Sequence, residues 1–312
     1  MIAGQGNLFV PIALFGWLPL VTWLFSKIKP YQAAALAFVA AWMFLPVASI
    51  PFKGLPDYTK VTATCVGIFF AAWKFDRERL LQFRFETVDI PMLLWCLCPI
   101  LSSVVNGLGV YDGVSSAMYQ SFTWGLPYFV GRVYFSDLKG INTLAIAIFV
   151  GGLVYVPFCL EEMAMSPQLH RLVYGFHQHS FLQTMRGNGY RPMVFMQHGL
   201  MVAMWMVSAL LIGLWLAYSG VLPEGFSRLP RIGKIFAKIS LPLLLVALLV
   251  TTVLMKSTGA FVLFLIGMLT LYLSNKFKTA LLVWLLICIP PVYMVARSTG
   301  WWTGEGLTNA IS

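Results

Sequence analysis

Long apolar runs separated by short polar connections make up most of the chain. Because a helix of about 20 residues crosses the apolar core of a bilayer, such runs predict transmembrane helices. The pattern places ten of them at residues 8–25, 31–50, 58–73, 90–105, 115–135, 138–159, 192–218, 239–255, 259–273 and 279–295. We therefore expect an all-α fold, a multi-pass bundle of about ten helices that forms a single membrane domain over residues 1–312.

The fifth run differs from the others because hydroxyl and amide side chains interrupt it. These side chains are Ser115, Ser116, Gln120, Ser121 and Thr123. A helix with such a face packs against other helices instead of lipid. Its polar face is a candidate cavity lining.

Composition agrees with a membrane protein and excludes several other classes. Of the 312 residues, 59% are hydrophobic and only 10% are charged, against about 25% charged in typical soluble domains. This balance excludes a soluble globular domain, a disordered chain and a disulfide-framed secreted domain. The runs leave no room for a large soluble domain, so the function has to lie in the bundle and its connections.

The net charge of +10 comes from Lys and Arg residues that lie mostly between the apolar runs. This placement is typical of the positive-inside rule and of contacts with anionic lipid, and it argues against nucleic-acid binding. Alternate connections, starting with the first, hold 14 of the 21 basic residues and are therefore assigned to the cytoplasm. They are Lys27, Lys29, Lys74, Arg77, Arg79, Arg84, Arg132, Lys139, Arg228, Arg231, Lys234, Lys238, Lys276 and Lys278.

The longest connection on the opposite face, residues 161–191, holds the main cluster of ionisable residues. Arg186 and Arg191 flank two glycines, and Pro192 is suited to the first position of the next helix. Backbone donors and two guanidiniums at a helix N-terminus make a good diphosphate site. The alternative is that these charges are simply solvated.

Three further residues could add to this site. His198 lies seven residues after Arg191, so a shared helix would place both on one face, with His198 about 10 Å deeper. Its alternative role is an interhelical hydrogen bond. Lys256 and Arg297 add cations on the same face, or extend to the interface as ordinary anchors.

Other polar residues of this connection are weaker candidates. His170, His177 and His179 lack the spacing of a metal site, so we expect no metal. Glu161 and Glu162 are adjacent on a helix and diverge by about 100°, so they are not expected to flank one bond as an acid and base pair. We expect them to cap the sixth helix or to be solvated.

Three motifs together resemble the O-antigen ligase and O-antigen polymerase superfamily of bacterial envelope enzymes. Arg186, Gly189 and Pro192 precede one long helix, the stretch 257–260 opens another, and Gly131 and Arg132 close the fifth helix. The resemblance covers roughly residues 85–312. It implies a helix bundle related to the C-type glycosyltransferases, in the bacterial inner (cytoplasmic) membrane, with the Arg186 loop facing the periplasm.

The resemblance also implies a reaction. An acceptor sugar or lipid-sugar would attack a glycan carried on undecaprenyl diphosphate or a similar lipid, without a metal or cofactor. Arg186 matches the arginine of the family and Arg191 lies beside it, so both are expected to bind the diphosphate. The turn after the eighth helix has Thr258 where many members carry arginine, with Lys256 two positions earlier; Lys256, Arg297 and His198 are the supporting residues.

The sequence departs from the family after its tenth helix. Members carry there a large external loop with the histidine proposed as the catalytic base, so the base of this chain is unknown, and we expect a truncated member. Two alternatives remain open: a transporter or flippase for an anionic lipid-linked substrate, and a non-catalytic membrane subunit. The sequence does not separate ligase from polymerase.

Overall fold

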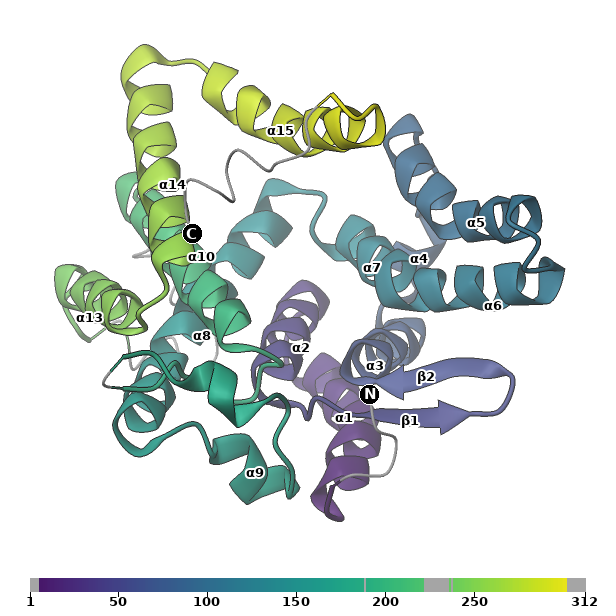
Figure 1. Ribbon diagram of the computed structural model, residues 1–312, viewed down its shortest axis with the longest axis horizontal. Helices are drawn as coiled ribbons and strands as arrows, with labels where there is room; N and C mark the ends of the chain where they lie inside the picture. The colour runs from purple at the N-terminus through teal and green to yellow at the C-terminus, as the bar shows by residue number, and fades with distance from the viewer. Residues whose placement is uncertain (1–5, 188, 222–235, 237, 302–312) are drawn as a thin grey trace. The chain divides into compact units, whose positions relative to one another are not determined.

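The computed structural model describes residues 6–187, 189–221, 236 and 238–301, and these are mostly helical (Figure 1). The chain divides into two compact units, Met1–Phe261 and Val262–Ser312. In the first unit the helices are α1 (Phe9–Lys27), α2 (Pro30–Phe44), α3 (Lys60–Phe75), α4 (Arg77–Leu81), α5 (Ile90–Val105), α6 (Val110–Gln120), α7 (Leu126–Tyr134), α8 (Leu138–Met165), α9 (Leu169–Tyr174), α10 (Gly199–Tyr218) and α13 (Leu241–Leu254). Helix α14 (Thr258–Phe277) starts in this unit, and its remainder forms the second unit with α15 (Leu281–Ser298).

Six of the described helical segments are long and apolar enough to cross a membrane. They are Phe9–Lys27, Thr87–Val105, Leu138–Met165, Gly199–Tyr218, Thr258–Phe277 and Leu281–Ser298. Two shorter apolar helices, α2 and α13, accompany them. The expected all-α class is confirmed, and the helices indicate a membrane protein.

A small β-hairpin stands where the second predicted helix was expected to end. Helix α2 stops at Phe44, and strands β1 (Ser49–Phe52) and β2 (Leu55–Thr59) pair in antiparallel fashion. The expected helix over 31–50 is therefore too long. Its end follows from Pro46 and Pro51, because the residue before a proline is disfavoured in helical conformation; Leu45 is accordingly extended.

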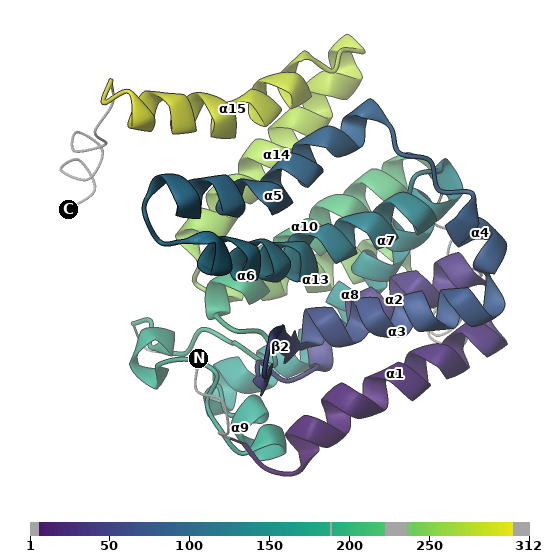
Figure 2. The same ribbon diagram turned by 90° about the vertical axis from the view of Figure 1, so that its right-hand side faces the viewer.

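The polar fifth run forms one interrupted helix. Helix α6 is followed by a π-helical turn, Ser121–Gly125, and then by α7. The Ser121 hydroxyl donates a 2.8 Å hydrogen bond to the carbonyl oxygen of Ala117. Helix α6 packs along α5 in both views (Figures 1 and 2).

Helix α8 is the centre of the first unit. It packs against α2, α10 and α13, and 61% of its most apolar window is buried, against 28% for α1. Two glycines allow close packing: Gly151 lies against Val39, Met43 and Trp205, and Gly152 lies against Ala209. Small residues at helix contacts let backbones approach in membrane bundles. The carboxyl end of α8 leads into the connection that holds the candidate site.

Candidate functional site

The helix that follows Arg191 begins at Gly199, with His198 as its N-cap. The expected helical start at Pro192 is therefore wrong. Residues 192–198 are not helical although they are largely buried. Side chains from elsewhere bind this backbone: the amide of Gln178 donates to the carbonyl oxygens of Val194 and Met196 at 3.0 and 3.1 Å.

Glu162 is the main partner of this segment. Its Oε2 accepts hydrogen bonds from the backbone N–H of Met193 at 2.8 Å and of Val194 at 2.7 Å. Its Oε1 accepts from the backbone N–H of Leu169 at 3.0 Å. The side chain is only 1% exposed, so the expectation of a solvated or capping role is wrong for Glu162. Helix α8 extends to Met165, so Glu162 lies in its last turn and reaches the connection from there.

Val194 is held in a strained conformation. Its φ is +49°, a left-handed value that is a genuine outlier for a β-branched residue. The N–H of Val194 binds Glu162 and its carbonyl oxygen binds Gln178. Backbone strain of about 1–3 kcal/mol persists only where surrounding contacts enforce it, and it occurs often at functional sites.

Arg186 and Arg191 lie at the two ends of a short hairpin. Met185 and Tyr190 form an isolated antiparallel bridge, and the N–H of Arg186 donates to the carbonyl oxygen of Gly189 at 3.0 Å. Gly187 has φ +53°, a conformation that favours glycine. The backbone brings the two guanidiniums to one region, as the spacing predicted, although no helix starts there.

Lys256 joins these two arginines from the turn between α13 and α14. Its Nζ donates to the carbonyl oxygen of Arg186, and its own carbonyl oxygen accepts from Nη2 of Arg191, both at 3.3 Å. We call Arg186, Arg191 and Lys256 the cation cluster. Among the described residues, none of the three forms an ion pair with a carboxylate, so three positive charges are held together by backbone contacts alone.

Arg191 lies beside the start of α10. A β-carbon on Gly199 would be 2.5 Å from Cδ of Arg191, so only glycine lets this side chain lie there. Its Nε is buried without a hydrogen-bond partner in the described structure. Burial lowers the pKa of Arg191, and Arg186 lowers it further, yet an arginine stays charged. The cation cluster therefore does reach a helix N-terminus, through packing on Gly199.

We expected His198 to lie deeper in a helix shared with Arg191, and this expectation is wrong. Its Nδ1 accepts the backbone N–H of Leu200 at 3.0 Å and so caps α10. Its ring contacts that of His179, with centroids 4.6 Å apart and planes at 88°. Burial lowers the pKa of His198, and His179, Arg191 and Arg186 lower it further.

The other histidines of the connection have different environments. His170 is 1% exposed; its Nδ1 donates to the carbonyl oxygen of Phe176, and its Nε2 accepts the N–H of Val47. The ring of His177 lies 5.9 Å from that of Phe181, centroid to centroid, in a tilted arrangement. The described residues contain no group of three potential ligands that could hold a metal ion.

An apolar cavity of about 690 Å³ runs along the first turns of α10. Its lining comes from α2, α7, α8 and α10 and includes Trp42, Gly131, Leu200 and Trp205. Leu200 follows Gly199, against which Arg191 packs. The cavity and the cation cluster are therefore linked through two consecutive residues at the start of α10.

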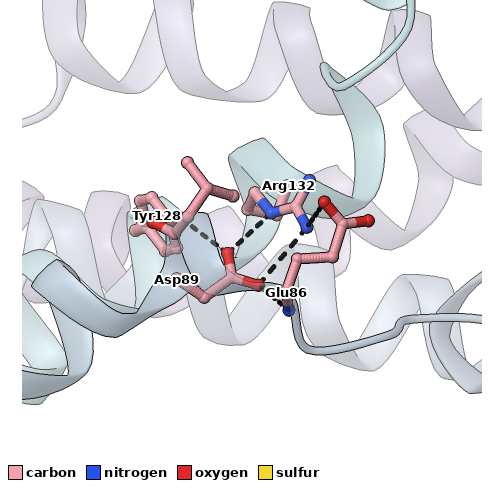
Figure 3. A network of polar contacts seen from close by, with 5 residues as sticks. Glu86, Asp89, Tyr128 and Arg132 are labelled. Carbon is pink, nitrogen blue, oxygen red and sulfur yellow. Dashed lines mark hydrogen bonds and ion pairs between the residues drawn. The ribbon is translucent and has the colours of Figure 1, made fainter.

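Arg132 belongs to a separate network (Figure 3). Its Nε donates to Oδ1 of Asp89 at 2.7 Å, and its Nη2 lies 3.4 Å from Oε2 of Glu86. The hydroxyl of Tyr128 donates to the same Asp89 oxygen at 2.6 Å. This network joins α7 to the start of α5, while the neighbouring Gly131 lines the cavity.

Arg297 lies in α15, within the second unit. Its expected part in the site stays a prediction. Sequence reasoning missed Glu162, Gln178, His179 and Gly199 as residues that build the site. These roles had no signal in the sequence, because each depends on the groups that the side chain or α-carbon meets in the folded chain.

The fold and the site indicate a helical membrane protein in which an ordered polar connection joins α8 to α10. Comparison with known proteins finds no matching family model, no matching curated protein and no matching solved structure. The function therefore has to be inferred from the chain's own residues.

Proposed function

We propose that this protein is a membrane glycosyltransferase that moves a glycan from a polyprenyl diphosphate to a sugar acceptor, in the manner of the O-antigen ligases and polymerases. The observation that carries the proposal is the cation cluster at the start of α10, whose first turns line the apolar cavity. A diphosphate with a long isoprenoid chain has the matching chemistry, with two anionic groups next to an extended apolar tail. A neutral solute would leave these three cations uncompensated.

The cation cluster supplies what the departure of a diphosphate needs. As the bond between the anomeric carbon and the diphosphate oxygen breaks, negative charge builds on that oxygen, and preorganised cations stabilise it. Arginine can bind two phosphate oxygens at once, whereas Lys256 contributes a point charge. Because no carboxylate among the described residues pairs with the cluster, its charge is free to act on a ligand.

The cavity supports binding of the lipid part. Its length along α10, from Leu200 to Ser208, corresponds to about 12 Å at 1.5 Å per residue. Its volume of about 690 Å³ lies in the usual range of ligand sites. We place the cation cluster at the periplasmic face of the inner membrane, on the distribution of Lys and Arg between connections. The acceptor hydroxyl and the group that deprotonates it are not assigned.

The test is the yield of transferred glycan in membranes that contain the lipid-linked donor. Arg186→Ala and Arg191→Ala are expected to abolish the product while the protein stays folded and abundant. Arg171→Ala is the matched control, since Arg171 is an exposed cation of the same connection and lies outside the cluster. Wild-type yield from both cluster variants would refute the proposal. Movement of labelled donor across reconstituted vesicles, without transfer, would favour a transporter instead.

A further inference from the structure

The tautomers of two histidines beside Arg191 are fixed by the backbone. The N–H of Ser180 donates to Nδ1 of His179 at 2.7 Å, and the N–H of Leu200 donates to Nδ1 of His198 at 3.0 Å. A backbone N–H can only donate, so each Nδ1 is unprotonated. A neutral imidazole then carries its proton on Nε2. Both rings therefore present an N–H at Nε2.

Neither Nε2–H is used within the described structure. No hydrogen bond joins either atom to another described residue, and neither is sealed away from solvent as Nε of Arg191 is. The two rings meet edge to face at 4.6 Å. With Arg191 they line one narrow crevice, whose interior is too tight to admit a water molecule.

This arrangement is suited to an anion and unsuited to a proton acceptor. A general base would need an unprotonated ring nitrogen facing its substrate, and in both rings that nitrogen already binds the backbone. Donors gathered next to a guanidinium bind phosphate oxygens through charge-assisted hydrogen bonds. The guanidinium of Arg191, whose buried Nε has no partner among the described residues, belongs to a residue that lines the same crevice.

We propose that His179 and His198 are neutral hydrogen-bond donors to a phosphate group at the mouth of this crevice, through Nε2–H, and that Arg191 binds the same group. This inference rests on the proposed function, because it assigns two further residues to the diphosphate site. It also separates His198 from the role of catalytic base. The depressed pKa of His198 agrees with a ring that stays neutral at physiological pH.

Two substitutions of His198 separate its two nitrogens. Asparagine places an acceptor near the position of Nδ1, but its side chain is too short to reach the position of Nε2. His198→Asn therefore keeps the cap on α10 and removes the donor at Nε2. Glutamine reaches the position of Nε2 with its amide N–H₂, so His198→Gln keeps a donor and removes the cap. A structural role alone predicts the opposite order of effects, because caps of this kind contribute to helix stability.

The experiment measures the affinity of the full detergent-solubilised chain for inorganic pyrophosphate, together with its unfolding temperature. We expect His198→Asn to weaken pyrophosphate binding about tenfold at an unchanged unfolding temperature. We expect His198→Gln to bind within about twofold of wild type and to unfold at a lower temperature. His179→Asn should also weaken binding, because Ser180 donates to its Nδ1 in the same way.

The outcomes distinguish the two proposals. If Arg191→Ala weakens binding and His198→Asn and His179→Asn do not, the histidine inference is refuted and the diphosphate site stands. If pyrophosphate binds equally to wild type, Arg191→Ala and both histidine variants, the diphosphate site fails as well. Weaker binding by His198→Gln than by His198→Asn would show that the cap, and not the donor, matters.

Discussion

The carboxylate of Glu162 accepts a 2.7 Å hydrogen bond from the backbone N–H of Val194, a residue held at φ +49°. This contact joins the carboxyl end of α8 to the segment that follows Arg191 and Pro192. Because Glu162 also accepts from Leu169 and Met193, one buried side chain fixes both ends of the connection. The position of Arg191 therefore depends on a residue that lies outside the cation cluster.

Replacement of this carboxylate tests that dependence. In Glu162→Gln one of the two carboxylate oxygens becomes an N–H₂ group, which cannot accept a hydrogen bond from a backbone N–H. We expect the free energy of unfolding to decrease by about 3 kcal/mol. Glu161→Gln is the control, since Glu161 is exposed. Thermal unfolding of the detergent-solubilised protein measures both variants. Equal unfolding temperatures would show that the buried carboxylate does not hold the connection.

Substitution of Gly199 is expected to lower ligand affinity without lowering stability. In Gly199→Ala the new methyl group would meet Cδ of Arg191 at 2.5 Å and the carbonyl oxygen of Pro192 at 3.1 Å. Alanine favours the helix by about 1 kcal/mol, so the loss should be in pyrophosphate affinity through displacement of Arg191. Gly259→Ala, near the start of α14 and with no atom within 4 Å of its added β-carbon, should bind as wild type. Unchanged affinity in Gly199→Ala would contradict this packing.

His170 predicts that stability decreases in acid. Burial lowers its pKa to about 4 from 6.5, so the unfolded chain takes up a proton first as the pH falls. Stability is complete above pH 6.5 and decreases toward pH 4, by about 3 kcal/mol in total. Protonation would also remove the acceptor that Nε2 offers to the N–H of Val47. The neighbouring Lys60 and His177 lower the pKa in the same direction.

The measurement for His170 is the unfolding temperature between pH 7 and pH 4, compared with His170→Gln. The variant should be less stable at pH 7 and should show a shallower decrease. His177 and His198 still titrate in it with lowered pKa values, so some decrease remains. Identical slopes for the two proteins would refute the assignment to His170.

The cavity predicts a dependence on lipid length. Gly131 lines it, and a β-carbon there meets no atom within 4 Å, so Gly131→Leu should fill part of the cavity without disturbing its walls. We expect transfer from a long-chain polyprenyl donor to decrease severalfold, and transfer from a short-chain analogue to decrease less. Gly16→Leu, at an exposed position of α1 that is equally open, is the control. Equal effects on the two donors would exclude the cavity as the lipid site.

The sequence predicted helices well where a run was apolar throughout and bounded by polar residues. The run 90–105 is α5 at both ends. The prediction from sequence failed at residues 45–59, where the apolar run continues through Pro46 and Pro51 into a hairpin. It failed again at 192–198, because these buried residues satisfy their backbone through Glu162, Gln178 and Tyr155. Hydropathy measures burial, and it does not show which groups bind the backbone.

The candidate site could be predicted in part. The spacing of Arg186 and Arg191 indicated two adjacent cations, and Lys256 was expected to add a third on the same face. The role of Gly199 could not be found, because it depends on the path of the Arg191 side chain across the start of α10. The tautomers of His179 and His198 likewise depend on backbone N–H groups one and two residues later, whose direction only the folded structure shows.

Asn7 links the beginning of α1 to a much later part of the chain. Its side-chain oxygen accepts the N–H of Phe9, while its side-chain amide and backbone N–H donate to Val173 and Tyr174 at 2.9 and 3.0 Å. Asn7 and Val173 are 166 residues apart in the sequence, and a ribosome synthesises a segment of this length in roughly 10 to 30 s. Helix α1 is therefore complete well before its amino end can meet these partners, and during that interval the polar groups of Asn7 need other hydrogen-bond partners, such as water.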